Sequence, residues 1–421
     1  MLIAKIKLRF NQSDSLKNIS VLAGGSVLSQ SVIVAVTPIL TRIYTPSEFG
    51  KLAIFMAVIL VIATTVSLRY EVNILIPKDK SEAVNLVFLS IVVSVFTGLL
   101  LFAFSLGLPD IILDLLGVRL IKSWLPWACL IGMATAINTV TLAWLNRIQN
   151  YKKISQIKII QSLVMVISSI ALGIYGHVEG LIVSQIISVI VVLGIVSRQL
   201  PKITHLSLGS IRKIAKKYVQ APMYLLPTAF LDVITLQIPI LFISAFYGDS
   251  EAGQFNLAWR VLILPASILG ASIGQVFFQR FSSVWPDNLA SWELLMKTWK
   301  MLAIAGCVPA ILLIIYGENL FSALFGQNWA ESGKMASILA PMLFISLLHS
   351  PTSTSSIVLG LQKPVFLLSL SILIYRPLSL WIGWKMGSIN IGLSIYSLME
   401  IIQILYFQFL VYNKIKIGVQ P

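Results

Sequence analysis

The chain has 421 residues, of which 57 % are hydrophobic and 11 % are charged. Soluble domains carry about 25 % charged residues, so these few charges cannot cover a water-facing surface, and a soluble multidomain enzyme is excluded. The net charge of +15 would indicate nucleic-acid binding in a soluble protein. Cys129 and Cys307 lie within apolar runs and define neither a disulfide framework nor a metal site.

Long apolar runs recur along the whole chain, and the first follows a basic N-terminal segment without the short cleavable region of a signal peptide. Each run is close to the ~20 residues that a helix needs to cross the hydrocarbon layer. They predict an all-α polytopic membrane protein with about twelve transmembrane helices, at 19–41, 49–70, 84–106, 124–146, 155–175, 179–199, 219–246, 252–277, 297–317, 335–360, 364–386 and 389–411.

The basic residues give this arrangement an orientation. With both termini inside, the inner segments carry 23 of the 31 Lys and Arg residues and the outer segments carry 6. Such an excess predicts that the inner segments face the cytoplasm, and it accounts for the net charge through contacts with anionic lipid headgroups instead of nucleic acid. The loops are too short for a folded domain, and 207–218 is predicted to be a basic amphipathic helix on the inner surface.

The sequence contains an internal repeat. Residues 38–53 and 239–258 both contain Pro-Ile-Leu followed by Tyr-x-x-Ser-Glu-x-Gly, and the second motif recurs at an offset of 203 residues, from Tyr44 to Tyr247. The offset is close to half the chain, so we expect two six-helix lobes, 1–205 and 206–421, related as a parallel repeat. Transporters built in this way place the substrate site between their halves.

Four ionisable residues lie near the middle of predicted spans, where a charge costs roughly 2.5–3.5 kcal/mol on insertion scales. They are Asp232, Arg260, Arg376 and Glu400. Counting from the turns places Asp232 level with Arg260, and Arg376 level with Glu400. One interpretation is structural pairing; the other is that the arginines bind an anionic substrate in a wet cavity while the carboxylates balance them or couple transport to an ion.

Further charged residues lie at predicted span ends: Arg42, Arg69, Glu71 and Arg147. Their side chains either extend to the lipid headgroups or guide an anionic headgroup along the cavity. Arginine suits phosphate because its guanidinium donates two parallel hydrogen bonds.

Several sequence signatures of enzymes are missing. The chain has neither a Walker-type nucleotide loop nor a His-Glu-x-x-His motif, and its three histidines are scattered. The outer loops are too short for the catalytic groups of a glycan polymerase. We therefore expect a protein that is not an enzyme and that needs no cofactor or metal.

Five stretches, in order along nearly the whole chain, resemble Wzx-type polysaccharide biosynthesis flippases, which share a superfamily with MATE exporters and lipid II flippases. They are 22–55 (LAGGSVLSQSVIVAVTPILTRIYTPSEFGKLAIF), 68–77, 144–155, 253–280 and 325–342. The resemblance implies a MATE-like fold with two lobes around a cationic central cavity. It also implies movement of an undecaprenyl-diphosphate-linked oligosaccharide from the cytoplasmic to the periplasmic leaflet of the bacterial inner membrane, for O-antigen (lipopolysaccharide) or capsule assembly.

These patterns give a set of hypotheses about function. The substrate-binding candidates are Arg42, Arg69, Arg147, Arg260 and Arg376; the ion-coupling or charge-pairing candidates are Glu71, Asp232 and Glu400. Expected partners are the lipid-linked oligosaccharide, membrane lipids and the polymerase and chain-length proteins of the same process. A MATE-like antiporter of small molecules or cations and a membrane-embedded glycan polymerase stay open as alternatives.

Overall fold

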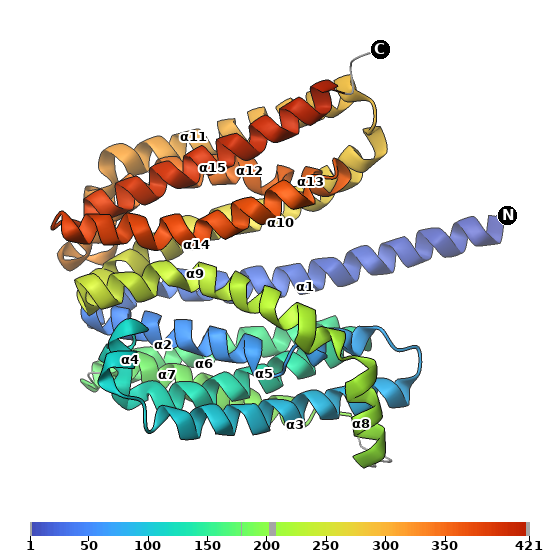
Figure 1. The fold of residues 1–421 in the computed structure, drawn as a ribbon, viewed down its shortest axis with the longest axis horizontal. Coiled ribbons are helices and arrows are strands. Elements are labelled where there is room, and N and C mark those ends of the chain that lie inside the picture. The colour runs from blue at the N-terminus through green and yellow to red at the C-terminus, as the bar shows by residue number, and fades with distance from the viewer. Residues whose placement is uncertain (1, 178, 202–207, 418–421) are drawn as a thin grey trace. The chain divides into compact units, whose positions relative to one another are not determined.

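The computed structural model describes residues 2–177, 179–201 and 208–417, and in these ranges helices are joined by turns, without a strand (Figure 1). Twelve of the helices in the described part of the chain are long, and each coincides with one predicted span. They are α1 (Leu2–Ile43), α2 (Pro46–Thr65), α3 (Lys80–Ser105), α5 (Leu125–Arg147), α6 (Tyr151–Ile174), α7 (Gly180–Ser197), α9 (Leu226–Tyr247), α10 (Asp249–Val284), α11 (Asn288–Phe325), α12 (Ala330–Thr352), α14 (Gln362–Lys385) and α15 (Ile389–Ile417).

The long helices are built for a hydrocarbon surrounding. Eleven candidate spans, long and apolar enough to cross a membrane, are found among the described residues, and α10 adds a helix of 36 residues. Large apolar side chains point outward, with Phe96 exposed by 64 % and Ile304 by 76 %. A helix satisfies its backbone hydrogen bonds internally, so such faces are stable only where lipid replaces water. The protein is a multi-pass membrane protein.

Short elements join the long helices. They are η1 (Tyr70–Leu75), α4 (Asp110–Leu115), η2 (Arg119–Trp124), α8 (Leu208–Lys217), η3 (Ala221–Leu225), η4 (Gln327–Trp329) and α13 (Ser355–Val358). Figure 1 shows α8 crosswise to α3, near the beginning of α3, as expected of a helix on the membrane surface. This is the predicted amphipathic helix, except that residue 207 lies outside the described residues.

The contacts divide the chain into two compact units: Met1–Tyr44 with Lys51–Gln237, and Thr45–Gly50 with Ile238–Pro421. In the first unit α6 packs against α1 and α7, and α3 packs against α5. In the second unit α12 packs against α10, α11 and α15, and α14 packs against α15. The predicted lobe boundary between residues 205 and 206 lies outside the described residues and stays a prediction.

The turn between α1 and α2 belongs to the second unit, where its contact with the beginning of α10 is reciprocal. A Cβ atom at Gly50 would overlap the carbonyl of Asp249, and one at Gly253 would overlap the carbonyl of Pro46. Both Pro46 and Asp249, and both Gly50 and Gly253, are separated by the repeat offset of 203 residues. Equivalent backbones therefore meet in a way that only glycine permits.

A pair of tyrosines repeats in the same register. In the first unit the Tyr44 hydroxyl donates to the carbonyl of Ser169 over 2.8 Å. In the second unit the Tyr247 hydroxyl donates to the carbonyl of Leu380 over 2.9 Å. The internal repeat of the sequence therefore has a structural counterpart. In each half, the tyrosine forms a hydrogen bond between the first hairpin and a later helix.

We predict that Gly50→Ala lowers the free energy of unfolding by about 1–3 kcal/mol, because the added methyl group overpacks a backbone contact that cannot rotate away. Gly194→Ala is the matched control, since a Cβ atom at this helical glycine meets nothing within 4 Å. Thermal unfolding of the detergent-solubilised protein measures both. Equal behaviour of the two variants would contradict the close backbone packing.

Candidate functional site

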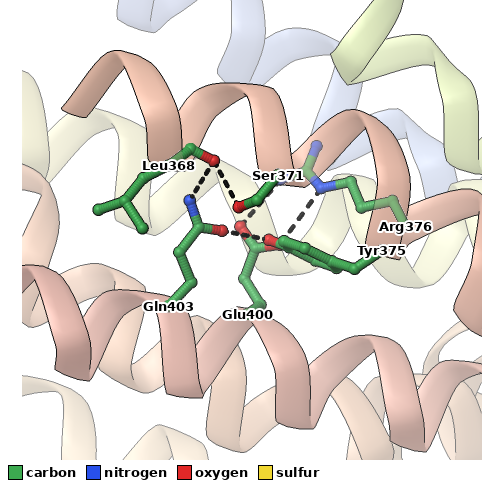
Figure 2. A network of polar contacts seen from close by, with 6 residues as sticks. All are labelled: Leu368, Ser371, Tyr375, Arg376, Glu400 and Gln403. Carbon is green, nitrogen blue, oxygen red and sulfur yellow. Dashed lines mark hydrogen bonds and ion pairs between the residues drawn. The ribbon is translucent and has the colours of Figure 1, made fainter. Parts of the chain in front are cut away.

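A buried polar network joins α14 and α15 in the second unit (Figure 2). Arg376 is 7 % exposed, and its Nη2 lies 2.8 Å from Glu400 Oε1 while its Nε lies 3.2 Å from Glu400 Oε2. The Tyr375 hydroxyl donates to Glu400 Oε2 over 2.6 Å and also lies within hydrogen-bond distance of Gln403 Oε1. Gln403 Nε2 donates to the carbonyl of Leu368 over 3.0 Å, which anchors the network to α14.

The geometry explains how two charges are tolerated inside a span. The guanidinium meets the carboxylate through two nitrogens, which is the strong, directional form of this ion pair. The guanidinium carbon also lies 5.6 Å from the centre of the Tyr396 ring, whose π face favours a cation. Removal of either charge would leave the other buried without compensation, so the pair is a unit that is stable only when both partners are charged.

A polar cavity of about 410 Å³ lies beside this network, within the second unit. Its wall contains the carboxylate-bearing Glu400, the amide of Gln403, the imidazole of His349 and five hydroxyl residues, Ser346, Ser353, Thr354, Ser356 and Ser369. Hydroxyl groups both donate and accept hydrogen bonds, so they suit water, a proton or a small polar ligand. The cavity therefore places a space lined by polar groups next to the carboxylate of the ion pair.

His349 is fixed at one wall of this cavity. Its Nδ1 lies 2.9 Å from Gln408 Nε2, and its ring packs edge-on against Phe407 with centroids 4.8 Å apart. The contact with the Gln408 side-chain amide and the packing against Phe407 together fix the orientation of the imidazole ring. The histidine is therefore an oriented group of α12 within the same cavity as Glu400.

Arg69 and Glu71 lie where the chain leaves α2 for η1. Arg69 has φ 62°, in the left-handed region, and its Nη1 lies 3.3 Å from Glu71 Oε1. Glu71 is 4 % exposed, and its Oε2 has no partner among the described residues. This local pair stabilises a backbone conformation that is unusual for a residue with a side chain.

Arg147 ends α5, and its Nη1 donates to the carbonyl of Ile74 over 2.9 Å, which connects the end of α5 to η1. It lines an open cavity of about 640 Å³ together with Lys80, Asn146, Gln149 and Tyr151, among others. Two cations, two amides and an aromatic ring form a suitable surface for a phosphorylated sugar.

The remaining predicted residues are placed separately. Arg42 is exposed at the end of α1, and Asp232 is exposed on α9. Arg260 is partly buried in α10, and no ion pair joins it to any described residue of its own unit. Asp232 belongs to the first unit and Arg260 to the second, so their pairing stays a prediction.

Sequence reasoning missed two polar residues. Tyr375 directly precedes Arg376, and neighbours in a helix do not normally share a partner, so only the structure reveals that both reach Glu400. Asn73 is buried in η1, and a short 3₁₀ segment has no periodic signal. No group of three or more His, Cys, Asp or Glu residues that could hold a metal occurs in the described ranges.

Comparison with known proteins gives one family. A model described as "Polysaccharide biosynthesis protein" matches residues 39–334. The teichuronic acid biosynthesis protein TuaB of Bacillus subtilis is 21 % identical over 203 residues, covering 48 % of this chain and 42 % of TuaB. The succinoglycan biosynthesis transport protein ExoT of Rhizobium meliloti is 24 % identical over 75 % of this chain and 64 % of ExoT.

A third relative, the lipopolysaccharide biosynthesis protein WzxC of Escherichia coli, is 25 % identical over 30 % of this chain and 25 % of WzxC. The matched regions thus span less than two thirds of the length of each of these relatives. The similarity to them is distributed over different parts of the chain, and ExoT covers the most of it among the three.

Solved structures share the fold. An inward-facing MATE multidrug transporter superposes with a TM-score of 0.70 at 13 % identity, covering 94 % of this chain and 96 % of the transporter. The lipid II flippase MurJ, in an inward closed conformation, gives 0.71 at 15 % identity, covering 94 % and 87 %. The predicted all-α architecture, with twelve transmembrane helices in two lobes, is confirmed.

We predict that Glu400→Leu and Arg376→Met each lower the free energy of unfolding by about 3–5 kcal/mol, because each leaves one buried charge unpaired. The double variant should unfold within about 1 kcal/mol of the parent, since two apolar side chains replace the pair. Lys334→Met and Glu318→Leu, an exposed pair 3.7 Å apart, should each cost less than about 1 kcal/mol. Thermal unfolding measures these changes. If the double variant lost as much free energy of unfolding as the two single variants together, Arg376 and Glu400 would not compensate each other's charge.

Proposed function

We propose that this chain, which belongs to the polysaccharide biosynthesis protein family, moves a lipid-linked oligosaccharide from the inner to the outer leaflet of the bacterial inner membrane. The resemblance to Wzx-type proteins is confirmed by the family match and by the relatives WzxC and ExoT. The printed names of WzxC and ExoT refer to lipopolysaccharide and succinoglycan, and that of MurJ refers to lipid II. The shared chemistry is a saccharide that is carried on or exported through a membrane.

The observation that carries the proposal is an arginine inside a span without a recorded carboxylate partner. Arg260 is partly buried in α10, in contrast to Arg376, which Glu400 neutralises. A guanidinium at this depth is costly unless an anion or water compensates it. The diphosphate of a lipid-linked sugar is such an anion, and the lipid tail of that molecule never needs to leave the hydrocarbon.

The predicted arginines at span ends belong to the first unit and are proposed to contact the headgroup near the membrane surfaces. Arg147 lines the open cavity at the end of α5, while Arg42 and Arg69 stand at the ends of α1 and α2. The excess of basic residues in the predicted inner segments supports cytoplasmic termini. In this orientation Arg69 and Arg147 are on the cytoplasmic side, where a newly built headgroup would be accepted, and Arg42 is on the periplasmic side.

The energy source is proposed to be an ion gradient, because the sequence has no nucleotide loop. Glu400 is the acid best placed to take up a proton, since it lines the polar cavity and its protonation would release Arg376. Loss of this ion pair removes an attraction between α14 and α15. Such a local change in charge can shift the equilibrium between two conformations of a transporter. Asp232, exposed on α9, is the second acidic candidate.

A MATE-like antiporter is the second candidate function, because the MATE transporter has nearly the same fold. The two candidates differ in charge preference. A cavity that exports cations needs unpaired acids, whereas Arg260 is a mid-span cation that forms no ion pair with a described residue of the second unit. A glycan polymerase is a weaker alternative because the outer loops are short. Polymerase and chain-length proteins are proposed partners that would act on the product after translocation.

We predict that deletion of the gene leaves single lipid-linked repeat units in the inner leaflet, because the headgroup cannot cross hydrocarbon unaided. A membrane-impermeant sugar-oxidising label applied to spheroplasts measures the exposed fraction. Accumulation of labelled, outward-facing units would contradict the proposal and indicate a polymerase. Normal glycan with loss of cationic dye export would instead indicate the antiporter.

In the same assay Arg260→Ala should reduce translocation at least tenfold, and Arg260→Lys should retain more activity because it keeps the charge. Arg280→Ala is the matched control, since Arg280 is exposed on the same helix. Equal activity of the Arg260→Ala and Arg280→Ala variants, at equal amounts in the membrane, would contradict the role of Arg260.

A further inference from the structure

A second cavity, separate from the polar network, lies on the first unit. It has a volume of about 570 Å³ and is formed by η1, the beginning of α3 and the segment from the end of α8 into η3. Its walls hold both polar and apolar side chains, among them Asn73, Ile76, Lys78, Glu82, Lys217 and Leu225. The proposed transport mechanism uses none of these residues.

The segment η1 is held firmly in place. Tyr70 and Ile74 are buried in a core cluster with Ile214 of α8, and the Tyr70 hydroxyl donates to the carbonyl of Ala215 over 3.3 Å. These contacts stabilise the left-handed turn at Arg69 that precedes η1. The wall of the cavity that η1 forms is therefore packed against α8 and the core of the unit.

One buried polar group in this wall lacks a partner. Asn73 lines the cavity, is only 8 % exposed, and its Nδ2 has no acceptor among the described residues. A buried amide N–H without an acceptor is destabilising, so an oxygen-bearing ligand in the cavity would be stabilised by this donor. The unsatisfied donor indicates a ligand that accepts hydrogen bonds.

The charges of the wall favour an anionic acceptor. Lys217 forms an ion pair with Glu82, which also accepts from the Tyr218 hydroxyl over 3.0 Å. The hydrogen bond with Glu82 raises the pKa of Lys217, so this lysine stays charged. Lys78 is exposed and forms no ion pair with a described residue of its unit. Two ammonium groups face one carboxylate, which leaves one excess positive charge.

The surroundings of the cavity indicate that the ligand comes from the membrane. Ile76 is 64 % exposed and Leu225 is 42 % exposed at its edge, so an apolar chain has a surface to lie on. The helix α8 places Ile211 and Ile214 toward the core while its sequence carries Arg212, Lys213, Lys216 and Lys217. Basic amphipathic helices of this kind lie at the headgroup level of anionic bilayers.

We propose that this cavity binds the phosphate-bearing headgroup of a lipid in the same leaflet as α8, with Asn73 and Lys78 as its donors and Ile76 and Leu225 against the acyl or prenyl chain. A lipid can use both the polar donors Asn73 and Lys78 and the apolar edge at Ile76 and Leu225, whereas a soluble anion can use only the donors. This site is independent of Arg260, so it holds whether or not the chain is a flippase.

The test measures lipid retention by the full-length protein in nanodiscs containing phosphatidylcholine with a minor amount of phosphatidylglycerol or of undecaprenyl phosphate. Native mass spectrometry counts the anionic lipids that stay bound. Lys78→Gln and Asn73→Leu should each reduce retention about ten- to hundredfold, as expected for loss of one hydrogen bond to a charged group. Inorganic pyrophosphate should not displace the lipid at equal concentration.

Two controls keep this test decisive. Asn138→Leu replaces an asparagine that is also 8 % exposed but lies in α5 outside the cavity, and Lys385→Gln replaces a lysine of the second unit. Both should retain lipid as the parent does, while thermal unfolding identifies any variant that fails to fold. Unchanged retention in the folded Lys78→Gln and Asn73→Leu proteins would overturn the site, and displacement by pyrophosphate would overturn its restriction to lipids.

Discussion

The structure depends on the cost of placing charge in hydrocarbon. A bilayer cannot solvate an arginine, so each guanidinium within a span needs a partner in the protein or in its ligand. Arg376 has such a partner in Glu400, whose carboxylate also accepts a hydrogen bond from the Tyr375 hydroxyl. No carboxylate among the described residues of the second unit forms an ion pair with Arg260, and we propose that the substrate compensates this charge.

The internal repeat positions these groups. Gly50 and Gly253 allow two equivalent backbones to meet at the turns, and Tyr44 and Tyr247 each fasten the first hairpin of a half to a later helix. The contact of the two glycines is reciprocal and lies within the second unit. The cavity beside Glu400 and the cavity beside Asn73 lie in different units, so the proposed coupling site and the proposed lipid site share no residue.

Much of this fold could be predicted, because the apolar runs needed to cross a bilayer are the strongest signal that a sequence contains. Counting from the turn also brought Arg376 level with Glu400, and the structure joins them. The boundaries were less accurate: the span predicted at 49–70 ends at Thr65, where the local pair of Arg69 and Glu71 stabilises a left-handed turn that hydropathy does not encode. The roles of Arg42, Arg69 and Arg147 stay predictions, since a span-end arginine gives the same pattern whether it contacts lipid or substrate.

The proposed coupling of an ion gradient to movement of the headgroup through Glu400 is measured in proteoliposomes with an internal pH-sensitive dye. A lipid-linked oligosaccharide is supplied in one leaflet, and proton flux and translocation are recorded together. We predict that proton flux and translocation of the oligosaccharide rise together when a proton gradient is imposed. The Arg376→Met/Glu400→Leu protein should fold but show no proton flux linked to translocation. Gradient-dependent translocation at the parental rate in that double variant would contradict it.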